Sequence, residues 1–237
     1  MNSPEISIVI PVANEAGELP ACLARIGGVP NEIIIVDAGS EDATAAVARE
    51  AGCLILAASE RQRARQMNRG AAQARGRILL FLHADTWLPP GALGKILAAI
   101  DRGGAVGGGF SRRYRSRSLT LALTARLATV RNHLFGWHLG DQAIFVRRDV
   151  FSALGGYRDL PIFEDLDFSR RLRARGRTVT LTPSVSSSAR RFTEAGPLRR
   201  TLADLRLTSR YLAGVAPNEL CKMAGVPVER SEAQTYE

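Results

Sequence analysis

The sequence is poor in lysine, in cysteine and in long apolar runs, and each scarcity excludes a class of protein. Only Lys95 and Lys222 are lysines, so the formal net charge of +9 comes almost entirely from arginine. The three cysteines (Cys22, Cys53 and Cys221) are odd in number and lie far apart, which argues against a disulfide framework or a zinc site and for a reducing compartment. No stretch approaches the roughly 18 uninterrupted apolar residues of a membrane span, so none is predicted.

The amino terminus and the basic segments narrow the choice further. The opening MNSPEISIVIP lacks a basic region before its short apolar stretch, which indicates a first strand rather than a signal peptide, and hence a cytoplasmic protein. A basic surface suits nucleic acid, anionic lipid headgroups or phosphorylated small molecules, or it is only a solvated face. The arginine clusters carry no interleaved aromatic residues of the kind that stack on bases, so nucleic acid is not an expected partner.

The first half of the chain alternates short apolar runs with helix-like segments. The runs lack polar alternation, as in strands buried on both faces of a parallel sheet, and cover 6–11, 32–38, 53–58 and 77–85. Helices are predicted between them over 17–26, 40–52 and 60–76, with Ser40 as a candidate N-cap and Gly52 and Gly76 as C-terminal stops. This alternation predicts an open α/β sheet, in which ligands bind beyond the carboxyl ends of the strands.

The second half is less regular. The patterns predict a glycine-rich strand over 103–114, an amphipathic helix over 118–137, a strand over 177–183 and a second amphipathic helix over about 197–220. No linker rich in Pro, Gly or Ser divides the chain, so we expect residues 1–196 to form one domain on which residues 197–237, a helix and a tail, pack. For the two amphipathic helices, core packing or a homodimer is favoured over the alternative, peripheral contact with a membrane.

Polar residues follow three of the predicted strands. PVANEAG (11–17) places Asn14 and Glu15 after the first strand, VDAGSEDAT (36–44) places Asp37 before a glycine turn, and HADT places His83 and Asp85 after the fourth. Each has a plain structural explanation, a turn for Asn14 and Glu15 and a cap for Asp37. Each also has a functional one, because such groups bind nucleotides, anions or a divalent cation that neutralises a departing diphosphate.

A second acidic motif, FEDLDF, stands far downstream. Glu164 and Asp165 begin a predicted helix, and Asp167 follows two residues later. Acids at a helix start often only complement the helix dipole. A carboxylate held near a reacting hydroxyl is equally a general base.

Five segments, in this order, resemble the family 2 glycosyltransferases: IPVANEA, VDAGSEDAT, RARQMNRGAAQARGRILLFLHADT, GDQAIFVRRDVFSALGGY and FEDLDFSRRLRARG, spanning roughly residues 5–190. Small, soluble bacterial members with HADT and GDQ segments are the most similar subgroup. The resemblance implies the GT-A type of α/β fold, a Rossmann-like, mostly parallel open sheet flanked by helices, here with a C-terminal helical extension. It implies an inverting transfer of a sugar from a nucleotide diphosphate sugar, first a UDP-sugar and otherwise a GDP-sugar, to an unidentified acceptor hydroxyl.

By position, the resemblance assigns donor-binding roles to residues in the first half of the chain. Those expected to line the nucleotide, its ribose and its diphosphate are Pro11, Glu15, Asp37, Arg65, Asn68 and Asp85. Asp85 matches the last acid of the family's D-x-D motif, which implies a divalent cation, Mn²⁺ or Mg²⁺.

In the second half, Asp165 matches the catalytic base, with Glu164 before it. Asp141 and Gln142 fall where the family shapes the pocket for the acceptor or the donor sugar.

Two departures from the family pattern bear on these roles. Ala38 replaces the second acid of the usual VDDGS and removes a polar contact to the base. His83 replaces the first acid of D-x-D, and a neutral imidazole there would favour Mn²⁺ over Mg²⁺. The alternative is that His83 is a strand-end histidine without a ligand.

Two other functions compete with sugar transfer. A nucleotidyltransferase would want a glycine-rich, basic signature after the first strand, and PVANEAGELP contains neither lysine nor arginine. A nucleotide-sugar-binding homologue without activity would keep the fold and lose the chemistry at positions such as His83 and Ala38.

Overall fold

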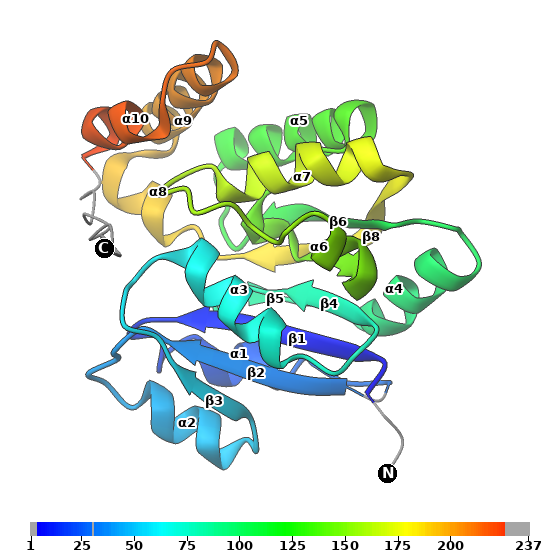
Figure 1. The fold of residues 1–237 in the computed structure, drawn as a ribbon. Helices are drawn as coiled ribbons and strands as arrows, with labels where there is room; N and C mark the ends of the chain where they lie inside the picture. The colour runs from blue at the N-terminus through cyan, green and yellow to red at the C-terminus, as the bar shows by residue number, and fades with distance from the viewer. Residues whose placement is uncertain (1–3, 30, 226–237) are drawn as a thin grey trace, which may run out of the picture.

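One mixed sheet organises the chain, for which a computed structural model describes residues 4–29 and 31–225 (Figure 1). Within these residues the strand order is β3-β2-β1-β4-β7-β6-β8-β5. The first four are mutually parallel: β3 (Leu54–Ala57), β2 (Asn31–Asp37), β1 (Ile6–Val12) and β4 (Ile78–Phe81). β7 (Ile144–Arg147) pairs antiparallel with β4 and with β6 (Gly107–Tyr114), β8 (Thr178–Ser187) runs parallel to β6, and β5 (Thr86–Trp87) closes the edge.

Helices cover both faces of the sheet. One face packs on α1 (Leu19–Leu23), α2 (Thr44–Glu50) and α4 (Ala92–Asp101), and the other on α3 (Arg63–Gln73), α6 (Arg148–Ala153) and α7 (Glu164–Arg175). Along β1, Ile8 and Ile10 enter the first core and Val9 the second, which explains the unbroken apolar run. α3 lies so close to β1 that a Cβ at Gly70 would stand 2.4 Å from Val9 Cγ1.

The remaining helices extend the second half of the sheet. α5 (Leu119–Phe135) packs on β6 and β8, α9 (Pro197–Leu212) on α5 and α8 (Arg190–Ala195), and α10 (Pro217–Ala224) on α9. The ring of Tyr211 in α9 stacks on Phe163 before α7, with 4.7 Å between centroids. These contacts support the expected packing of the C-terminal helix on residues 1–196, which stays a prediction, and the expected tail over 226–237 lies outside the described residues. No helix among those described is long and apolar enough to span a bilayer.

The α/β class with a mostly parallel sheet flanked by helices is confirmed, but several boundaries were wrong. The helix predicted over 17–26 is only the five-residue α1. The helix predicted over 40–52 begins at Thr44, because Ser40 hydrogen-bonds to Asp37 instead of capping the helix. The helix predicted over 60–76 is α3, which begins later and is capped by the side chain of Gln62.

Boundaries near the site and at the C-terminus also differ. β4 ends at Phe81, not at Asp85, because the chain turns there, with the Thr86 N–H donating to the His83 carbonyl at 3.0 Å. β8 runs on to Ser187 instead of ending at residue 183, since its later residues pair with β6 and β5. The helix predicted over 197–220 is broken into α9 and α10, with Pro217 in the first turn of α10.

Candidate functional site

The loops that follow β1 and β2 form one hydrogen-bonded unit at the carboxyl edge of the sheet. The Asn14 N–H donates to Ser40 Oγ at 2.9 Å, and Asn14 Oδ1 accepts from the Glu41 N–H at 2.8 Å. Glu15 is tied to the start of α2, because its N–H donates to Thr44 Oγ1 at 2.8 Å. Parallel neighbours necessarily end at the same edge, so polar residues far apart in sequence meet here.

Gln66, which the sequence analysis missed, joins these strand ends from α3. Its buried amide Nε2 donates to the Val36 carbonyl at 2.8 Å and to the Val12 carbonyl at 3.2 Å. Gln66 therefore holds the tips of β1 and β2 at a set distance. The available signal was a polar residue on the otherwise apolar inner face of α3, beside Ala64 and Met67.

Only one carboxylate oxygen of Asp37 accepts hydrogen bonds from the described residues. Its Oδ1 accepts from the Ser40 N–H at 2.9 Å and the Ser40 hydroxyl at 2.7 Å, while no hydrogen bond from the described residues reaches Oδ2. The carboxylate is thus oriented by the turn and keeps one oxygen for a ligand. Pro11, the neighbouring expectation, lies inside β1 opposite Val36 and is half-buried.

Glu15 and Asp85 form an acidic pair at the tips of β1 and β4. Glu15 Oε1 lies 3.5 Å from Arg190 Nη2, whereas Oε2 is buried without a partner among the residues described. Burial raises the pKa of Glu15, and the negative charge of Asp85 raises it further, against the opposing effect of Arg190. The Asp85 carboxylate receives one long hydrogen bond, from Thr86 Oγ1 at 3.4 Å.

This pair fits a divalent cation that is shared with a substrate phosphate. Mg²⁺ in particular is usually bound through one or two carboxylates together with phosphate oxygens. In the described part of the chain, no group of three or more His, Cys, Asp or Glu could enclose an ion by itself. The donor set of Asp85 and Glu15 therefore suits a nucleotide-bridged cation and not a closed structural metal site.

His83 lies against Gly140, in the segment that precedes β7. A Cβ on Gly140 would stand 2.6 Å from His83 Nε2, so only a glycine lets the 3₁₀ turn η1 (Gly140–Gln142) approach the ring. Burial lowers the pKa of His83 to about 4, and the charge of Arg63 lowers it as well. The imidazole is therefore neutral near pH 7, so one ring nitrogen donates a hydrogen bond and the other accepts one.

Glu164 and Asp165 open α7 and face the strand tips across Gly140. Asp165 Oδ2 accepts from the Gly140 N–H at 2.7 Å, and Oδ1 accepts from the Leu166 N–H at 2.7 Å. Burial raises the pKa of Asp165, and the charge of Asp141 adds to this. Burial also raises the pKa of Glu164 to about 7, with Asp165 as the second cause. Two adjacent acids whose pKa values are raised are typical of acid–base chemistry.

Arg63 and Arg191 bring positive charge to the same place, and sequence reasoning chose neither. Partial burial lowers the pKa of Arg191, and the positive charge of Arg63 lowers it further, so the two guanidinium groups lie close enough to repel each other. The structure shows no ion pair for either within residues 4–29 and 31–225. Two like charges held together, neither in a direct ion pair, suit an anion such as a diphosphate.

Arg65 and Asn68, the residues expected near the diphosphate, bond within the protein. Arg65 pairs with Glu60 and with Asp159, its Nη2 lying 2.7 Å from Asp159 Oδ2. The Asn68 amide exchanges two hydrogen bonds with the backbone of Tyr157, at 2.8 and 2.9 Å. Both side chains clamp α3 to the loop between α6 and α7. The structure thus does not bring these two together with the acids of the site.

Asp141 and Gln142 have different surroundings in η1. Gln142 is buried, and its amide bonds the Leu139 N–H, an Arg131 guanidinium N–H and the Phe110 carbonyl at 3.0–3.2 Å. It therefore shapes the turn from within. Asp141 pairs through Oδ2 with Arg112, and its Oδ1 is buried without a hydrogen-bond partner in the described chain.

The acids of the site gather beyond the strand tips of an open α/β sheet, where such sheets bind ligands, and comparison with known proteins identifies the family. Residues 7–154 match the family described as Glycosyl transferase family 2. The chain belongs to this family and has its GT-A type of fold. It is 31% identical over 224 residues to a PGL/p-HBAD biosynthesis glycosyltransferase of Mycobacterium bovis (strain BCG / Pasteur 1173P2), covering 89% of this chain and 85% of that protein.

Two solved structures show the same fold at low sequence identity. A mannosyltransferase from Pyrobaculum calidifontis, in complex with GDP-Man and Mn²⁺, aligns with a TM-score of 0.64 at 19% identity over 79% of this chain and 57% of that one. S. aureus TarS 1-349, in complex with UDP-GlcNAc, aligns with a TM-score of 0.62 at 16% identity over 78% of this chain and 58% of that one. The chain thus spans less than two thirds of either solved protein.

Proposed function

We propose that the protein is an inverting glycosyltransferase that moves a sugar from a nucleotide diphosphate sugar to an acceptor hydroxyl. The observation that carries this proposal is Asp165, a part-buried carboxylate oriented by the Gly140 and Leu166 N–H groups and held in no ion pair among the residues described. A raised pKa makes it a better base than an ordinary aspartate. The strand tips opposite it carry the donor-binding groups.

In the proposed reaction the acceptor oxygen attacks the anomeric carbon from the face opposite the diphosphate. The new C–O bond forms while the bond from the anomeric carbon to the diphosphate oxygen breaks, and its electron pair leaves with the nucleoside diphosphate. Asp165 takes the hydroxyl proton, so the products are the glycoside, the nucleoside diphosphate and one proton on the carboxylate. One displacement at one carbon inverts its configuration.

The nucleotide is proposed to lie across the tips of β1, β2 and β4. Asp37 offers its free Oδ2 to the base or ribose, and the absence of an acid at Ala38 leaves a single carboxylate in that turn. Asp85, aided by Glu15, would hold a divalent cation, Mn²⁺ or Mg²⁺, which when bound neutralises charge on the diphosphate. Arg63 and Arg191 add fixed positive charge to the leaving group. A UDP- or GDP-sugar is the proposed donor, since solved relatives of the same fold bind UDP-GlcNAc and GDP-Man.

The test compares two neighbouring acids of α7. Asp167 is ion-paired to Arg171 at 2.7 Å and to Arg158 at 3.1 Å, so it serves as the matched structural control for Asp165. With UDP-, GDP- and dTDP-sugars and Mn²⁺, we expect donor turnover that Asp165→Asn lowers by about 10²–10⁴-fold. Asp167→Asn should lower the melting temperature and leave kcat within a few-fold. NMR of the product should show the inverted anomer.

Other outcomes would identify the competing functions. Donor binding without turnover, and no effect of Asp165→Asn, would mark an inactive binding homologue. Release of pyrophosphate from a nucleoside triphosphate and a sugar phosphate would mark a nucleotidyltransferase. A retained anomeric configuration would overturn the inverting mechanism.

A further inference from the structure

α5 turns its large apolar side chains away from the protein. Its buried face consists of Leu121, Ala125, Ala128 and Asn132, whereas Leu119, Leu123, Leu127, Val130 and Leu134 recur on the opposite face at a spacing of three or four residues. Leu119 is 86% exposed and Leu134 66%. Core packing, one of the two favoured explanations, is therefore wrong for these five outward residues, because Leu121 and smaller residues make the contact with the rest of the protein.

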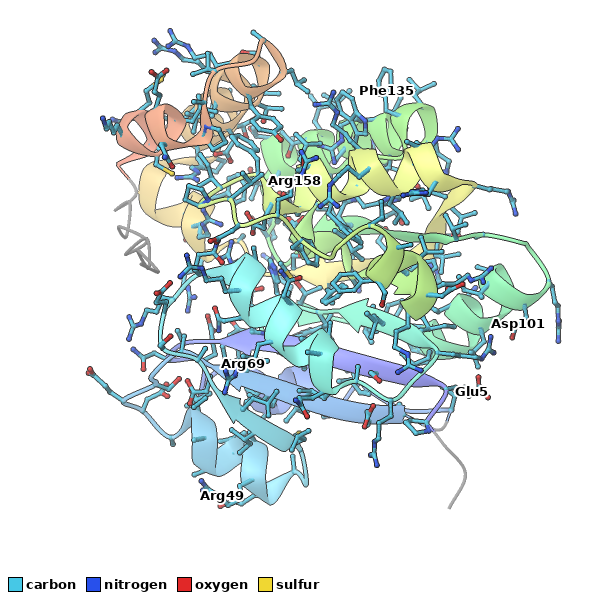
Figure 2. All side chains as sticks on the ribbon, in the orientation of Figure 1. Glu5, Arg49, Arg69, Asp101, Phe135 and Arg158 are labelled. Atoms are coloured by element: carbon cyan, nitrogen blue, oxygen red, sulfur yellow. The ribbon has the colours of Figure 1, made fainter. Side chains whose placement is uncertain are left out.

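α9 repeats the pattern and lies against α5. Leu198, Leu202, Leu205 and Leu212 share one exposed face, and α9 has no fully buried residue. We call these leucines, together with the five outward residues of α5, the apolar surface. Figure 2 shows Phe135, at the end of α5, on the side of the molecule opposite Arg49 of α2. Within the described residues no element covers the apolar surface, and soluble monomers rarely leave so many large apolar side chains together in water.

The charges beside the apolar surface are positive. α5 contains no aspartate or glutamate, and its Arg126 is exposed next to the outward leucines. On α9, Arg199, Arg206 and Arg210 are exposed along one flank of its leucines. Asp204, the one acid of α9, pairs with Arg200 at 3.0 Å.

This combination of apolar and basic residues selects between the possible occupants. A second copy of the chain docked face to face would bring these arginines together, which costs free energy through like-charge repulsion. An anionic bilayer instead accepts leucines between its lipids while its headgroups pair with the flanking arginines. We propose that the apolar surface binds the protein peripherally to an anionic membrane.

The position of the surface connects it to the active site. α9 follows directly on α8, which carries Arg190 and Arg191 to the acids of the site. Binding through α5 and α9 would hold that side of the site near the headgroups. On this basis, and resting on the proposed function, the acceptor hydroxyl belongs to an amphiphile held in the membrane.

Sedimentation with lipid vesicles tests the membrane proposal without any substrate. We expect the protein to bind vesicles of phosphatidylcholine mixed with phosphatidylglycerol, and to bind less in high salt, where exposed charges are screened. The double variant Leu123→Glu, Leu127→Glu should weaken binding by about tenfold or more. Leu54→Glu is the matched control: Leu54 is 46% exposed on β3, which lies on the opposite side of the molecule (Figure 1), and its variant should bind as the unchanged protein does.

If circular dichroism shows that the leucine variant does not fold, variants of the flanking arginines test the membrane proposal instead. Arg126→Glu with Arg206→Glu should also weaken binding, whereas Arg49→Glu, exposed on α2, should not. No vesicle binding by the unchanged protein would overturn the proposal. A dimer in light scattering that the leucine variant dissociates, without vesicle binding, would instead assign the surface to a second copy. Vesicle binding without turnover of any nucleotide sugar would count against the proposed function alone.

Discussion

The two sides of the site, here called by their proposed roles the donor side and the catalytic side, satisfy their polar groups differently. On the donor side, the loops after β1 and β2 bond to each other through Asn14, Ser40 and Thr44. On the catalytic side, burial raises the pKa values of Glu164 and Asp165 although the charge of Arg63 opposes it, and neither acid forms an ion pair in the described chain. The first side is stabilised by its own hydrogen bonds and should exist before the donor arrives. The second carries an electrostatic cost, as groups reserved for chemistry often do.

Removing the carboxylate of Asp85 should have the largest effect on the donor side. Asp85→Ala deletes the main proposed cation ligand, so we expect kcat/KM for the donor to fall about a hundredfold or more. A chelator should reduce the unchanged protein to the same level. Equal activity of the variant and the unchanged protein across a Mn²⁺ titration would show that Asp85 does not hold the cation.

Arg63 and Arg65 offer a sharper comparison, because they lie on one turn of α3 and only Arg65 is ion-paired within the described residues. Arg63→Ala should raise KM for the nucleotide sugar about tenfold or more through loss of charge beside the diphosphate. Arg65→Ala should leave KM nearly unchanged and cost up to about 1 kcal/mol of unfolding free energy, since it breaks exposed pairs with Glu60 and Asp159. Steady-state kinetics and urea unfolding of both variants measure this. A raised KM for Arg65→Ala and an unchanged KM for Arg63→Ala would instead assign the diphosphate contact to Arg65.

Glu164 should make the catalytic side sensitive to pH. Its pKa rises from the ordinary 4.5 to about 7 on folding, so folding favours the protonated form. That contribution to stability is complete below about pH 4.5 and is lost as the pH rises through about 7. The Glu164→Gln variant does not lose stability in this way, because the glutamine amide does not titrate. We expect the unfolding free energy of the unchanged protein, relative to the variant, to fall by no more than about 3 kcal/mol across this range.

Chemical denaturation at a series of pH values measures this difference. The subtraction removes the contribution of His83, which the two proteins share. Parallel stability curves for the two would show that Glu164 titrates normally.

Ser40→Ala should have the smallest effect and tests how far the donor side is preformed. The change removes one hydrogen bond to Asp37 and the acceptor of the Asn14 N–H, and should cost about 1 kcal/mol of stability. The affinity for a nucleotide sugar should weaken only a few-fold, because the Ser40 N–H still orients Asp37. Isothermal titration calorimetry distinguishes this from a large loss, which would mean that the loop is not preformed.

The sheet, and the gathering of acids at its carboxyl edge, could be predicted because their signals are local. Buried parallel strands appear as unbroken aliphatic runs, and the acids that follow them must meet at one edge. Which of Arg63 and Arg65 is left for a ligand could not be predicted. Arg65 forms an ion pair with Asp159, which lies 94 residues further along the chain. Gln66 was missed for the same reason, since its partners are backbone carbonyls of two strands that no side-chain pattern reveals.

By itself, the sequence determined the alternation of strands and helices, the acids at the strand tips and the order of motifs that marks family 2. Periodicity and motif spacing act over a few residues, so they can be seen in a single chain. Only the tertiary structure decided which face of α5 is buried, because leucines and alanines satisfy the same apolar pattern and close approach to β6 and β8 favours the smaller ones. It also decided that His83, Gly140 and Asp165 touch, which follows from packing η1 and α7 against the end of β4.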